Sequence, residues 1–201
     1  MNKPINRWDE RYGGEEFYYG KEPNDFLSEQ ASKIKSSGQV LCLAEGEGRN
    51  AVYLASLGYQ VTAIDSSAEG LRKLDLLAQE RGVRVQTIQA DLAEYKIEKK
   101  WDGIVSIWCH LPPALRQRVH AQIVDGLVTG GKLILESYTP DQLKYKTGGP
   151  PDAALLTTQI ELREQFKDLK IIIAEEKLRN ISEGKGHLGL SAVVQVLAEK
   201  S

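Results

Sequence analysis

Two glycines and two carboxylates follow successive apolar segments in the first half of the chain. Residues 40–43 lead into a loop that carries Gly46 and Gly48, and a helical pattern begins directly after it. Asp65 ends the next apolar segment, and Asp91 follows the third. Glycines let a ligand approach backbone N–H groups at a helix N-terminus, and a carboxylate there can accept hydrogen bonds from ribose hydroxyls. This order of groups predicts a site for a nucleotide cofactor.

The segments that must position these groups alternate between strand-like and helix-like patterns, which predicts a parallel sheet with crossover helices. Five strands are expected, at 40–43, 61–64, 83–90, 101–108 and 132–136. Two further runs, 169–179 and 188–198, are joined by too few residues for a parallel crossover, so they should pair antiparallel. The expected fold is α/β: a Rossmann-like three-layer sandwich of five parallel strands plus a C-terminal antiparallel hairpin.

Local signals place several helices within this pattern. Ser66 with Glu69, and Thr158 with Glu161, have the spacing of capping boxes that begin helices. An apolar stripe supports the first of these helices, at Leu71, Leu74, Leu77 and Ala78. His120 lies off the apolar stripe of the helix predicted from Pro112 to about Leu127, so we expect a solvated side chain there.

Length and composition indicate one ordinary domain. With 201 residues the chain can bury a core without staples, and we expect a single domain over 1–201. Within it, 1–38 would form an N-terminal cap segment, 39–137 a cofactor-binding half, and 138–201 a loop, a helix and the hairpin. The net charge of −2 gives no reason to expect nucleic acid or an anionic membrane as partner.

Cysteine usage and the N-terminus favour a cytoplasmic location. Cys42 and Cys109 are the only cysteines and lack metal-ligand spacing, which indicates reduced thiols and no metal site. The N-terminus has no apolar leader-like run, and no stretch approaches the roughly 20 apolar residues of a membrane span.

Taken together, these pieces resemble the class I S-adenosylmethionine-dependent methyltransferases, in the small branch related to tellurite-resistance and thiopurine methyltransferases. The resemblance covers about residues 7–200. The segments that carry it are 46–55, 63–66, 89–92, 106–113 and 183–187.

The resemblance implies a function and a cofactor site. The protein would transfer a methyl group from S-adenosylmethionine to a small molecule, such as a thiol or a selenium or tellurium oxyanion, as a monomer or weak homodimer. The glycine loop would hold the methionine part, Asp65 the ribose hydroxyls, and Asp91 with the Leu92 backbone the adenine edge. The implied cofactor-binding residues are Ala44, Glu45, Gly46, Gly48, Asn50, Asp65, Ser66, Asp91, Leu92 and Ile107.

The loop departs from the family pattern at two positions. Cys42 stands where the family usually has an acidic residue, and Ala44 where it has a glycine. Ala44 is a mild change if its φ is negative and a costly one if the loop needs a positive φ. Glu45 or Glu47 could replace the missing carboxylate.

Two other functions remain open at this point. Gly46-x-Gly48-x-x-Ala51 with Asp65 also fits the fingerprint of a nicotinamide-dependent oxidoreductase. The absence of a second mononucleotide-binding half and the terminal hairpin argue against that function. The unusual loop also leaves room for a non-catalytic S-adenosylmethionine-binding protein.

The remaining candidate residues concern the methyl acceptor. His110 follows the fourth strand at the edge where open α/β sheets bind ligands, and it is the candidate general base if the acceptor needs one. The candidate substrate-binding residues are Tyr18, Tyr19, Arg179 and His187. Arg179 and Glu183 could instead be ordinary surface charges, and His187 a surface residue. His110 could instead cap the start of the helix that begins at Pro112.

The N-terminus is rich in aromatic residues. Six of the fourteen aromatic residues lie in the first 26 positions. They predict either a helix docked permanently on the sheet or a mobile lid, in which aromatic faces attract a sulfonium cation and exclude water.

Overall fold

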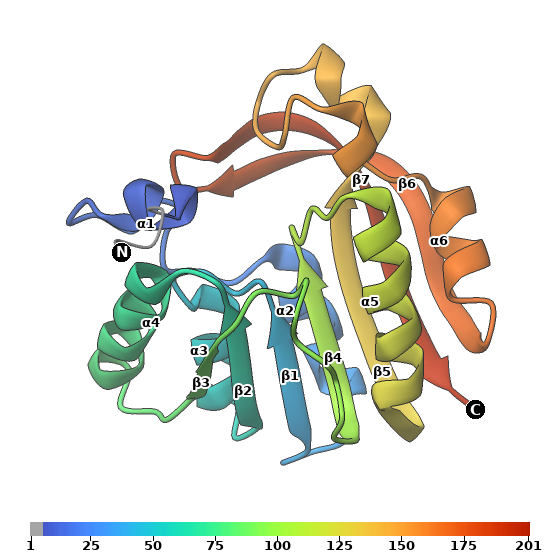
Figure 1. Cartoon of the computed structure of the whole chain (residues 1–201), viewed down its shortest axis with the longest axis horizontal. Coiled ribbons are helices and arrows are strands. Elements are labelled where there is room, and N and C mark those ends of the chain that lie inside the picture. The colour runs from blue at the N-terminus through green and yellow to red at the C-terminus, as the bar shows by residue number, and fades with distance from the viewer. Residues whose placement is uncertain (1–5) are drawn as a thin grey trace.

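One seven-stranded sheet runs through the molecule, in the order β3-β2-β1-β4-β5-β7-β6 (Figure 1). The computed structural model describes residues 6–201; residues 1–5, which begin the predicted cap segment, lie outside that range. Strands β1 to β5 pair in parallel, and β7 pairs antiparallel with both β5 and β6. The predicted α/β fold, with five parallel strands and a terminal hairpin, is confirmed. The strands are β1 (Gln39–Leu43), β2 (Gln60–Asp65), β3 (Gln86–Gln89), β4 (Trp101–Ile107), β5 (Leu127–Tyr138), β6 (Leu169–Glu183) and β7 (His187–Lys200).

Helices cover both faces of this sheet. Side chains from α2, α3 and α4 pack with alternate strand residues such as Val40 and Val61 on one face. Side chains from α5 and α6 pack with the intervening residues, such as Leu41 and Ile64, on the other. The helices are α1 (Arg7–Tyr12), α2 (Asp25–Gln30), α3 (Arg49–Ser56), α4 (Ala68–Glu80), α5 (Pro113–Gly126) and α6 (Gln159–Gln165), with short 3₁₀ turns η1 (Ala31–Lys33), η2 (Pro140–Lys144) and η3 (Ala153–Leu155).

The period of the apolar residues explains this layering. Leu74 and Leu77 of the predicted α4 stripe are fully buried, as are Ile123 of α5 and Phe166 after α6. Burying a side chain of this size contributes roughly 1.5–3 kcal/mol. The helices are therefore held mainly by their apolar faces.

One of the two predicted capping boxes is wrong by one residue. Ser67, rather than Ser66, caps α4, and its side chain accepts the Gly70 N–H. The hydroxyl of Ser66 instead accepts a hydrogen bond from Asn6. Because α4 begins one residue later than expected, Ser66 is left in the loop. The second box, Thr158 with Glu161, is confirmed at the start of α6.

Several strand limits differ from those expected. β3 begins at Gln86 rather than at 83, since Val83 closes the end of α4 by donating to the Ala78 carbonyl. β5 begins at Leu127 rather than at 132, because Leu127 already pairs with Trp101 and an irregularity in the register absorbs the extra residues. The hairpin strands are also longer than expected, and they extend the sheet beyond the parallel part.

The prediction for His120 is wrong. Its side chain is only 4% exposed, packs on Phe166 and lies 2.5 Å from Gln165 Oε1. Burial lowers the pKa of the imidazole to about 4. His120 lies outside the apolar stripe of α5, but α6 docks on α5 and buries it.

Over residues 6–201, none of the helices has both the length and the apolar character that crossing a membrane requires.

Candidate active site

A cavity of about 1140 Å³ lies along the carboxyl edge of the parallel strands. One end of the cavity, which we call the strand end, is lined by residues at or just after the ends of β1, β2 and β3, among them Ala44, Asp65 and Asp91. At what we call the hairpin end, residues that follow β4 and the β6–β7 turn line it, among them His110 and His187. The hairpin reaches back over this edge toward α1 (Figure 1). The topology thus brings groups from five strands around one cavity.

The two glycines of the loop allow close packing at the strand end. Gly48 has a φ of 89°, and a Cβ there would stand 2.2 Å from the Leu74 side chain of α4. Gly46 has a φ of 58°, and a Cβ there would stand 2.5 Å from the Tyr12 hydroxyl. Both positions therefore need glycine for their backbone conformation and for the space around them.

Asp65 is a buried carboxylate with capacity left for a ligand. It is 7% exposed; one oxygen accepts the Gly46 N–H at 2.8 Å and the other accepts the Ser67 N–H at 2.8 Å. Burial raises the pKa of the Asp65 carboxyl, against the effect of these N–H groups. Each carboxylate oxygen can accept a further hydrogen bond, which is what a ribose diol would supply.

Asp91 and Leu92 lie at the other side of the strand end. Asp91 is exposed at the cavity, and its Oδ1 accepts the Ala93 N–H at 2.7 Å. Leu92 is buried against the face that α5 covers. The turn after β3 therefore presents one carboxylate oxygen and one apolar side chain at the cavity.

The structure resolves both departures in the loop. Ala44 has a φ of 50°, so alanine in place of the family's glycine is the costly change there. Cys42 is 0% exposed within the apolar cluster beside α3, and burial raises the pKa of its thiol. Cys42 is not among the residues that line the cavity.

Glu45 holds a carboxylate close to where the family has its acidic residue. Its Oε1 accepts the Ala51 N–H at 2.6 Å, at the N-terminus of α3, and the residue lines the cavity. Burial raises the pKa of the Glu45 carboxyl to about 7. The loop thus keeps a carboxyl group, about half ionised near pH 7, at a position three residues later.

The hairpin end of the cavity is aromatic. The Trp108 ring lies 4.4 Å from the buried Tyr138 ring and 4.8 Å from the His187 imidazole, which in turn lies 4.7 Å from Tyr19. Trp108 has a φ of 56°, which is rare for a bulky residue and costs about 1–3 kcal/mol. Strain of this kind persists where the surroundings fix it, and here it turns the indole toward the cavity.

His110 lines the cavity beside this cluster. Its Nδ1 lies 3.4 Å from the Ser137 hydroxyl, and its Nε2 is buried without a partner in the described part of the chain. Burial, and to a lesser degree the charge of His187, lowers the pKa of the His110 imidazole to about 3. The ring is therefore neutral near pH 7, where it can form hydrogen bonds but accepts a proton weakly.

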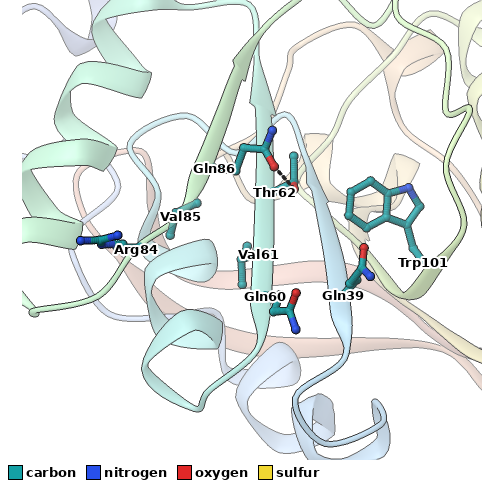
Figure 2. A pocket seen from close by; sticks show the side chains of 8 residues that line it. All are labelled: Gln39, Gln60, Val61, Thr62, Arg84, Val85, Gln86 and Trp101. Atoms are coloured by element: carbon teal, nitrogen blue, oxygen red, sulfur yellow. Dashed lines mark hydrogen bonds between the residues drawn. The ribbon is translucent and has the colours of Figure 1, made fainter.

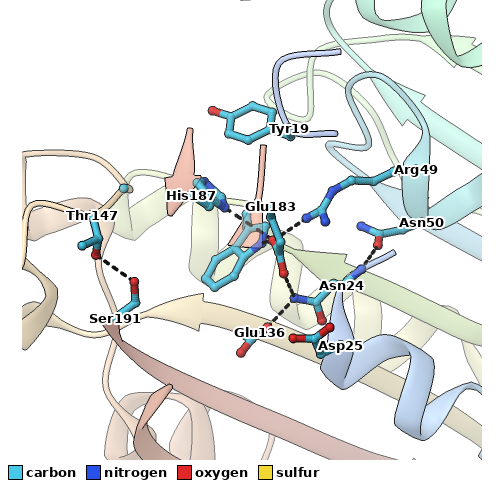
Figure 3. A network of polar contacts seen from close by, with 12 residues as sticks. Tyr19, Asn24, Asp25, Arg49, Asn50, Glu136, Thr147, Glu183, His187 and Ser191 are labelled. Atoms are coloured by element: carbon cyan, nitrogen blue, oxygen red, sulfur yellow. Dashed lines mark hydrogen bonds and ion pairs between the residues drawn. The ribbon is translucent and has the colours of Figure 1, made fainter. Parts of the chain in front are cut away.

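Beneath the hairpin end lies a buried polar network built on two glutamates (Figure 3). Glu183 binds Arg49 at 2.6 Å and Arg179 at 3.1 Å, and it accepts the Trp108 indole N–H at 2.7 Å. Glu136 accepts two hydrogen bonds from Arg179, at 2.8 Å each. No periodic pattern in the sequence indicates this network, because its members come from α3, β5, β6 and the loop after β4.

Most predicted site residues are brought together by this arrangement, and two are not. Gly46 and Arg179 are absent from the cavity lining. The Gly46 N–H donates to the Asp65 carboxylate and so helps to fix the loop. The guanidinium of Arg179 is bound by Glu136, Glu183 and Asp25. The alternative of an ordinary surface charge is also wrong for Arg179 and Glu183, which are paired in the interior. The predicted residues that line the cavity are Tyr18, Tyr19, Ala44, Glu45, Gly48, Asn50, Asp65, Ser66, Asp91, Leu92, Ile107, His110 and His187.

The N-terminal segment closes one side of the cavity. Glu47 accepts the N–H groups of Tyr18 and Tyr19, and it forms a buried ion pair with Lys73 at 2.8 Å. The Tyr18 carbonyl accepts the Lys185 N–H from the hairpin turn. In this conformation the segment is docked, and its opening as a lid stays a prediction.

A smaller hollow, of about 370 Å³, lies at the opposite, amino edge of the sheet, and none of the predicted site residues lines it (Figure 2). Arg84 is the one charged side chain among its lining residues. Among residues 6–201, no group of three or more His, Cys, Asp or Glu side chains is arranged to hold a metal ion.

Comparison with known proteins identifies the family. Residues 15–183 match the family model described as tellurite resistance protein TehB. The chain belongs to the TehB family. A relative from Haemophilus influenzae, named probable S-adenosyl-L-methionine-dependent methyltransferase TehB, is 29% identical over 154 residues, which are 74% of this chain and 51% of that protein. The chain thus spans about half the length of the curated relatives it matches.

Solved structures support the fold. The crystal structure of TehB from Haemophilus influenzae has a TM-score of 0.70 at 23% identity, covering 86% of this chain and 60% of that one. The N-methyltransferase NodS from Bradyrhizobium japonicum, in complex with S-adenosyl-L-homocysteine, has a TM-score of 0.70 at 12% identity, covering 96% of each chain. At these identities the likeness shows the class I methyltransferase fold.

Proposed function

We propose that this TehB-family protein is an S-adenosylmethionine-dependent methyltransferase that acts on a small molecule. The observation that carries the proposal is the convergence of the glycine loop, Asp65 and Asp91 around one end of a single cavity. The name of the Haemophilus influenzae relative and the S-adenosyl-L-homocysteine bound to NodS support the same cofactor class.

The groups at the strand end fit the parts of this cofactor. The unfilled acceptor capacity of Asp65 suits the two ribose hydroxyls, and the exposed carboxylate of Asp91 suits a donor on the adenine edge. Glu45, at the start of α3, suits the cofactor's ammonium group. The cavity exceeds the roughly 300–1,000 Å³ of common ligand sites, so it has room for an acceptor beside the cofactor.

The bound cofactor would supply the activated methyl group, and the protein would supply orientation and a dry environment. Tyr18 and Tyr19 cover the cavity from the N-terminal side, and the hairpin covers it from the other. The aromatic faces of Trp108 and Tyr19 favour a sulfonium cation and keep water away from it. His110, neutral near pH 7, would orient the acceptor through a hydrogen bond rather than store its proton.

The acceptor is proposed to be a soft nucleophile, such as a thiol or a selenium or tellurium oxyanion. Such groups need no strong general base, which agrees with the low pKa of His110. The family's association with tellurite resistance favours the same group of acceptors.

Calorimetry with S-adenosylhomocysteine and with NAD tests the cofactor class. We expect S-adenosylhomocysteine to bind and NAD not to bind. The sheet offers one mononucleotide-binding half, whereas NAD spans two. Asp65→Ala should weaken S-adenosylhomocysteine binding at least tenfold, since each hydrogen bond to a charged group contributes roughly 1.5–3 kcal/mol. Asp102→Ala is the matched control, as its carboxylate binds the Gln39 N–H at the opposite edge of the sheet.

A turnover screen completes the test, with methyl-labelled S-adenosylmethionine and a panel of thiols, selenite, tellurite and catechols. Cofactor binding without turnover on the whole panel would favour a non-catalytic binding protein. NAD binding with unchanged affinity for S-adenosylhomocysteine in Asp65→Ala would overturn the proposed site.

A further inference from the structure

A short strap of the N-terminal segment, residues 16–20, bridges the glycine loop and the turn of the hairpin. On the loop side, Glu47 Oε2 accepts the N–H groups of Tyr18 and Tyr19, at 2.8 and 3.3 Å. On the turn side, the Tyr18 carbonyl accepts the Lys185 N–H at 2.8 Å. The strap backbone is therefore bound from both sides, and it joins the strand end of the cavity to the hairpin end.

Glycines in the hairpin turn let the strap approach closely. A Cβ on Gly184 would collide with the Tyr18 carbonyl oxygen, and a Cβ on Gly186 would collide with the Tyr19 ring. Arg11 also donates to the Tyr19 hydroxyl, at 3.0 Å. The strap thus has a defined path, along which both tyrosines line the cavity.

The carboxylate that binds the strap lies in the middle of the glycine loop. Glu47 stands between Gly46 and Gly48 and is 4% exposed. Its two oxygens have separate partners: Oε2 accepts the strap N–H groups, and Oε1 binds Lys73 Nζ of α4 at 2.8 Å. The same Nζ donates to the Glu16 carbonyl at 2.7 Å. A buried carboxylate and a buried ammonium thus both bind the strap backbone.

This ion pair is better explained by the strap than by the core. A buried ion pair is often no more stabilising than apolar side chains of the same volume. Lys73 is 2% exposed, and Leu74 and Leu77 of the same helix already supply fully buried apolar groups. Backbone hydrogen bonds to the pair, by contrast, can be exchanged for bonds to water when the strap opens.

The loop that carries Glu47 is also the loop proposed to hold the cofactor. Its Gly46 N–H donates at 2.8 Å to Asp65, the proposed ribose-binding carboxylate. A ligand that fixes this loop also fixes the Glu47 carboxylate, and a docked strap in turn fixes the loop. Because coupling between two binding events is reciprocal, a change that releases the strap must also weaken the hold on the ligand.

We propose that Glu47 is a positioning residue that fastens the strap over the bound cofactor, so that the cofactor leaves only after the strap N–H groups have left the carboxylate. Glu47 acts through Tyr18 and Tyr19, whose side chains line the cavity. The proposal rests on the proposed function and adds to it how the ligand is retained.

Glu47→Gln tests the separate roles of the two oxygens. Glutamine has one oxygen, which the Lys73 ammonium attracts most strongly, so its NH₂ group faces the strap N–H groups, donor against donor. We expect S-adenosylhomocysteine to dissociate at least about tenfold faster in stopped-flow displacement, since a hydrogen bond to a charged group is lost. The association rate constant should change little. Glu69→Gln is the control, because Glu69 lies on the same helix as Lys73 but pairs with Arg72 near the surface.

A second substitution separates a fastened strap from a merely structural ion pair. In Glu47→Gln/Lys73→Met no ammonium competes for the amide oxygen, so this oxygen can accept the strap N–H groups again. We expect slower release than in Glu47→Gln alone, although the bond from Lys73 to Glu16 is also lost. Release that is as fast as in the single variant, or faster, would contradict the proposal. So would variants that unfold at lower temperature yet release the ligand at the wild-type rate.

A glycine variant covers the case in which Glu47→Gln does not fold. Gly186→Ala pushes on the Tyr19 ring from the hairpin side and leaves no buried charge unpaired. It should also speed release, whereas Gly14→Ala, whose Cβ meets open space, should not. Equal release rates in these two variants would count against a strap that retains the ligand.

Amide exchange separates this proposal from the proposed function. If S-adenosylhomocysteine does not bind the wild type, the proposed function is wrong, and exchange of the Tyr18 and Tyr19 amides in the free protein decides the role of Glu47. Faster exchange in Glu47→Gln than in Glu69→Gln then supports that role, and equal exchange overturns it. If the ligand binds but leaves Glu47→Gln at the wild-type rate, the cofactor assignment stands and the role of Glu47 is wrong.

Discussion

Ala44→Gly should make this protein more stable, although most substitutions to glycine do the opposite. Ala44 has a φ of 50°, in the left-handed region where a Cβ crowds the following carbonyl oxygen. The residue lies between β1 and the glycine loop, and it is only partly buried. Replacing it by glycine removes the crowding and leaves the loop's path unchanged.

The magnitude follows from three contributions. Relief of the left-handed conformation is worth about 1–2 kcal/mol. The greater freedom of glycine in the unfolded chain costs about 0.4–1 kcal/mol, and loss of a half-buried methyl group costs about 0.4 kcal/mol, half the value for a fully buried one. The balance is a gain of about 0.5 kcal/mol, which raises the Tm of a chain of this length by about 1–2 °C.

Thermal unfolding followed by circular dichroism measures this shift. Ser37→Gly is a parallel case, because Ser37 is an exposed loop residue with a φ of 57°. Ala121→Gly is the opposite control; Ala121 is exposed in the middle of α5, where glycine costs about 1 kcal/mol, or about 2–4 °C in Tm. S-adenosylhomocysteine should bind Ala44→Gly no more weakly than wild type. A Tm that falls in Ala44→Gly as it does in Ala121→Gly would refute the reasoning.

Three further predictions concern the same edge of the sheet. Burial raises the pKa of Glu45 to about 7, and the cofactor's ammonium group pairs with the ionised carboxylate. Affinity for S-adenosylhomocysteine should therefore fall by up to about tenfold per pH unit between pH 7 and 5.5. Calorimetry of Glu45→Gln should show no such fall. Cys42→Asp should unfold at a lower denaturant concentration at pH 8 than at pH 5. A carboxyl in this apolar cluster has a raised pKa, so folding stability is lost as pH rises. Equal unfolding midpoints at the two pH values would mean that the new carboxylate reaches water. Amide exchange over residues 7–20 should slow when S-adenosylhomocysteine binds, if the segment opens as a lid; exchange that is already as slow as in α5 without ligand would show a permanent part of the core.

The architecture could be predicted because the relevant signals are local. Alternating apolar segments fixed the strand count and the antiparallel hairpin, and Thr158 with Glu161 marked the start of α6. The expected ligand groups at Asp65 and Asp91 follow from one rule, that parallel strands end at the same edge. These predictions needed no knowledge of which side chains meet across the sheet.

The predictions that failed depend on contacts between distant segments. His120 is buried by α6, and the Ser66 hydroxyl is taken by Asn6, sixty residues earlier. Arg179 is a predicted substrate-binding residue, but its guanidinium is bound by Glu136 and Glu183, which lie 43 and 4 residues away in the sequence. The apolar periodicity of a helix or strand does not indicate such pairings. It shows which face of that element is buried, and it does not show which residue of a distant element a polar side chain will contact.

Backbone strain connects the fold to the site. Among residues 6–201, four residues other than glycine have a positive φ, and three of them, Ala44, Trp108 and Lys146, line the large cavity. Ser37, the fourth, lies in an exposed loop. Unfavourable conformations persist where the surrounding structure imposes them, and they gather at ligand sites. Relief of strain at Ser37 should therefore stabilise the protein without functional cost, whereas a change at Trp108 would also move the indole that Glu183 holds at the cavity wall.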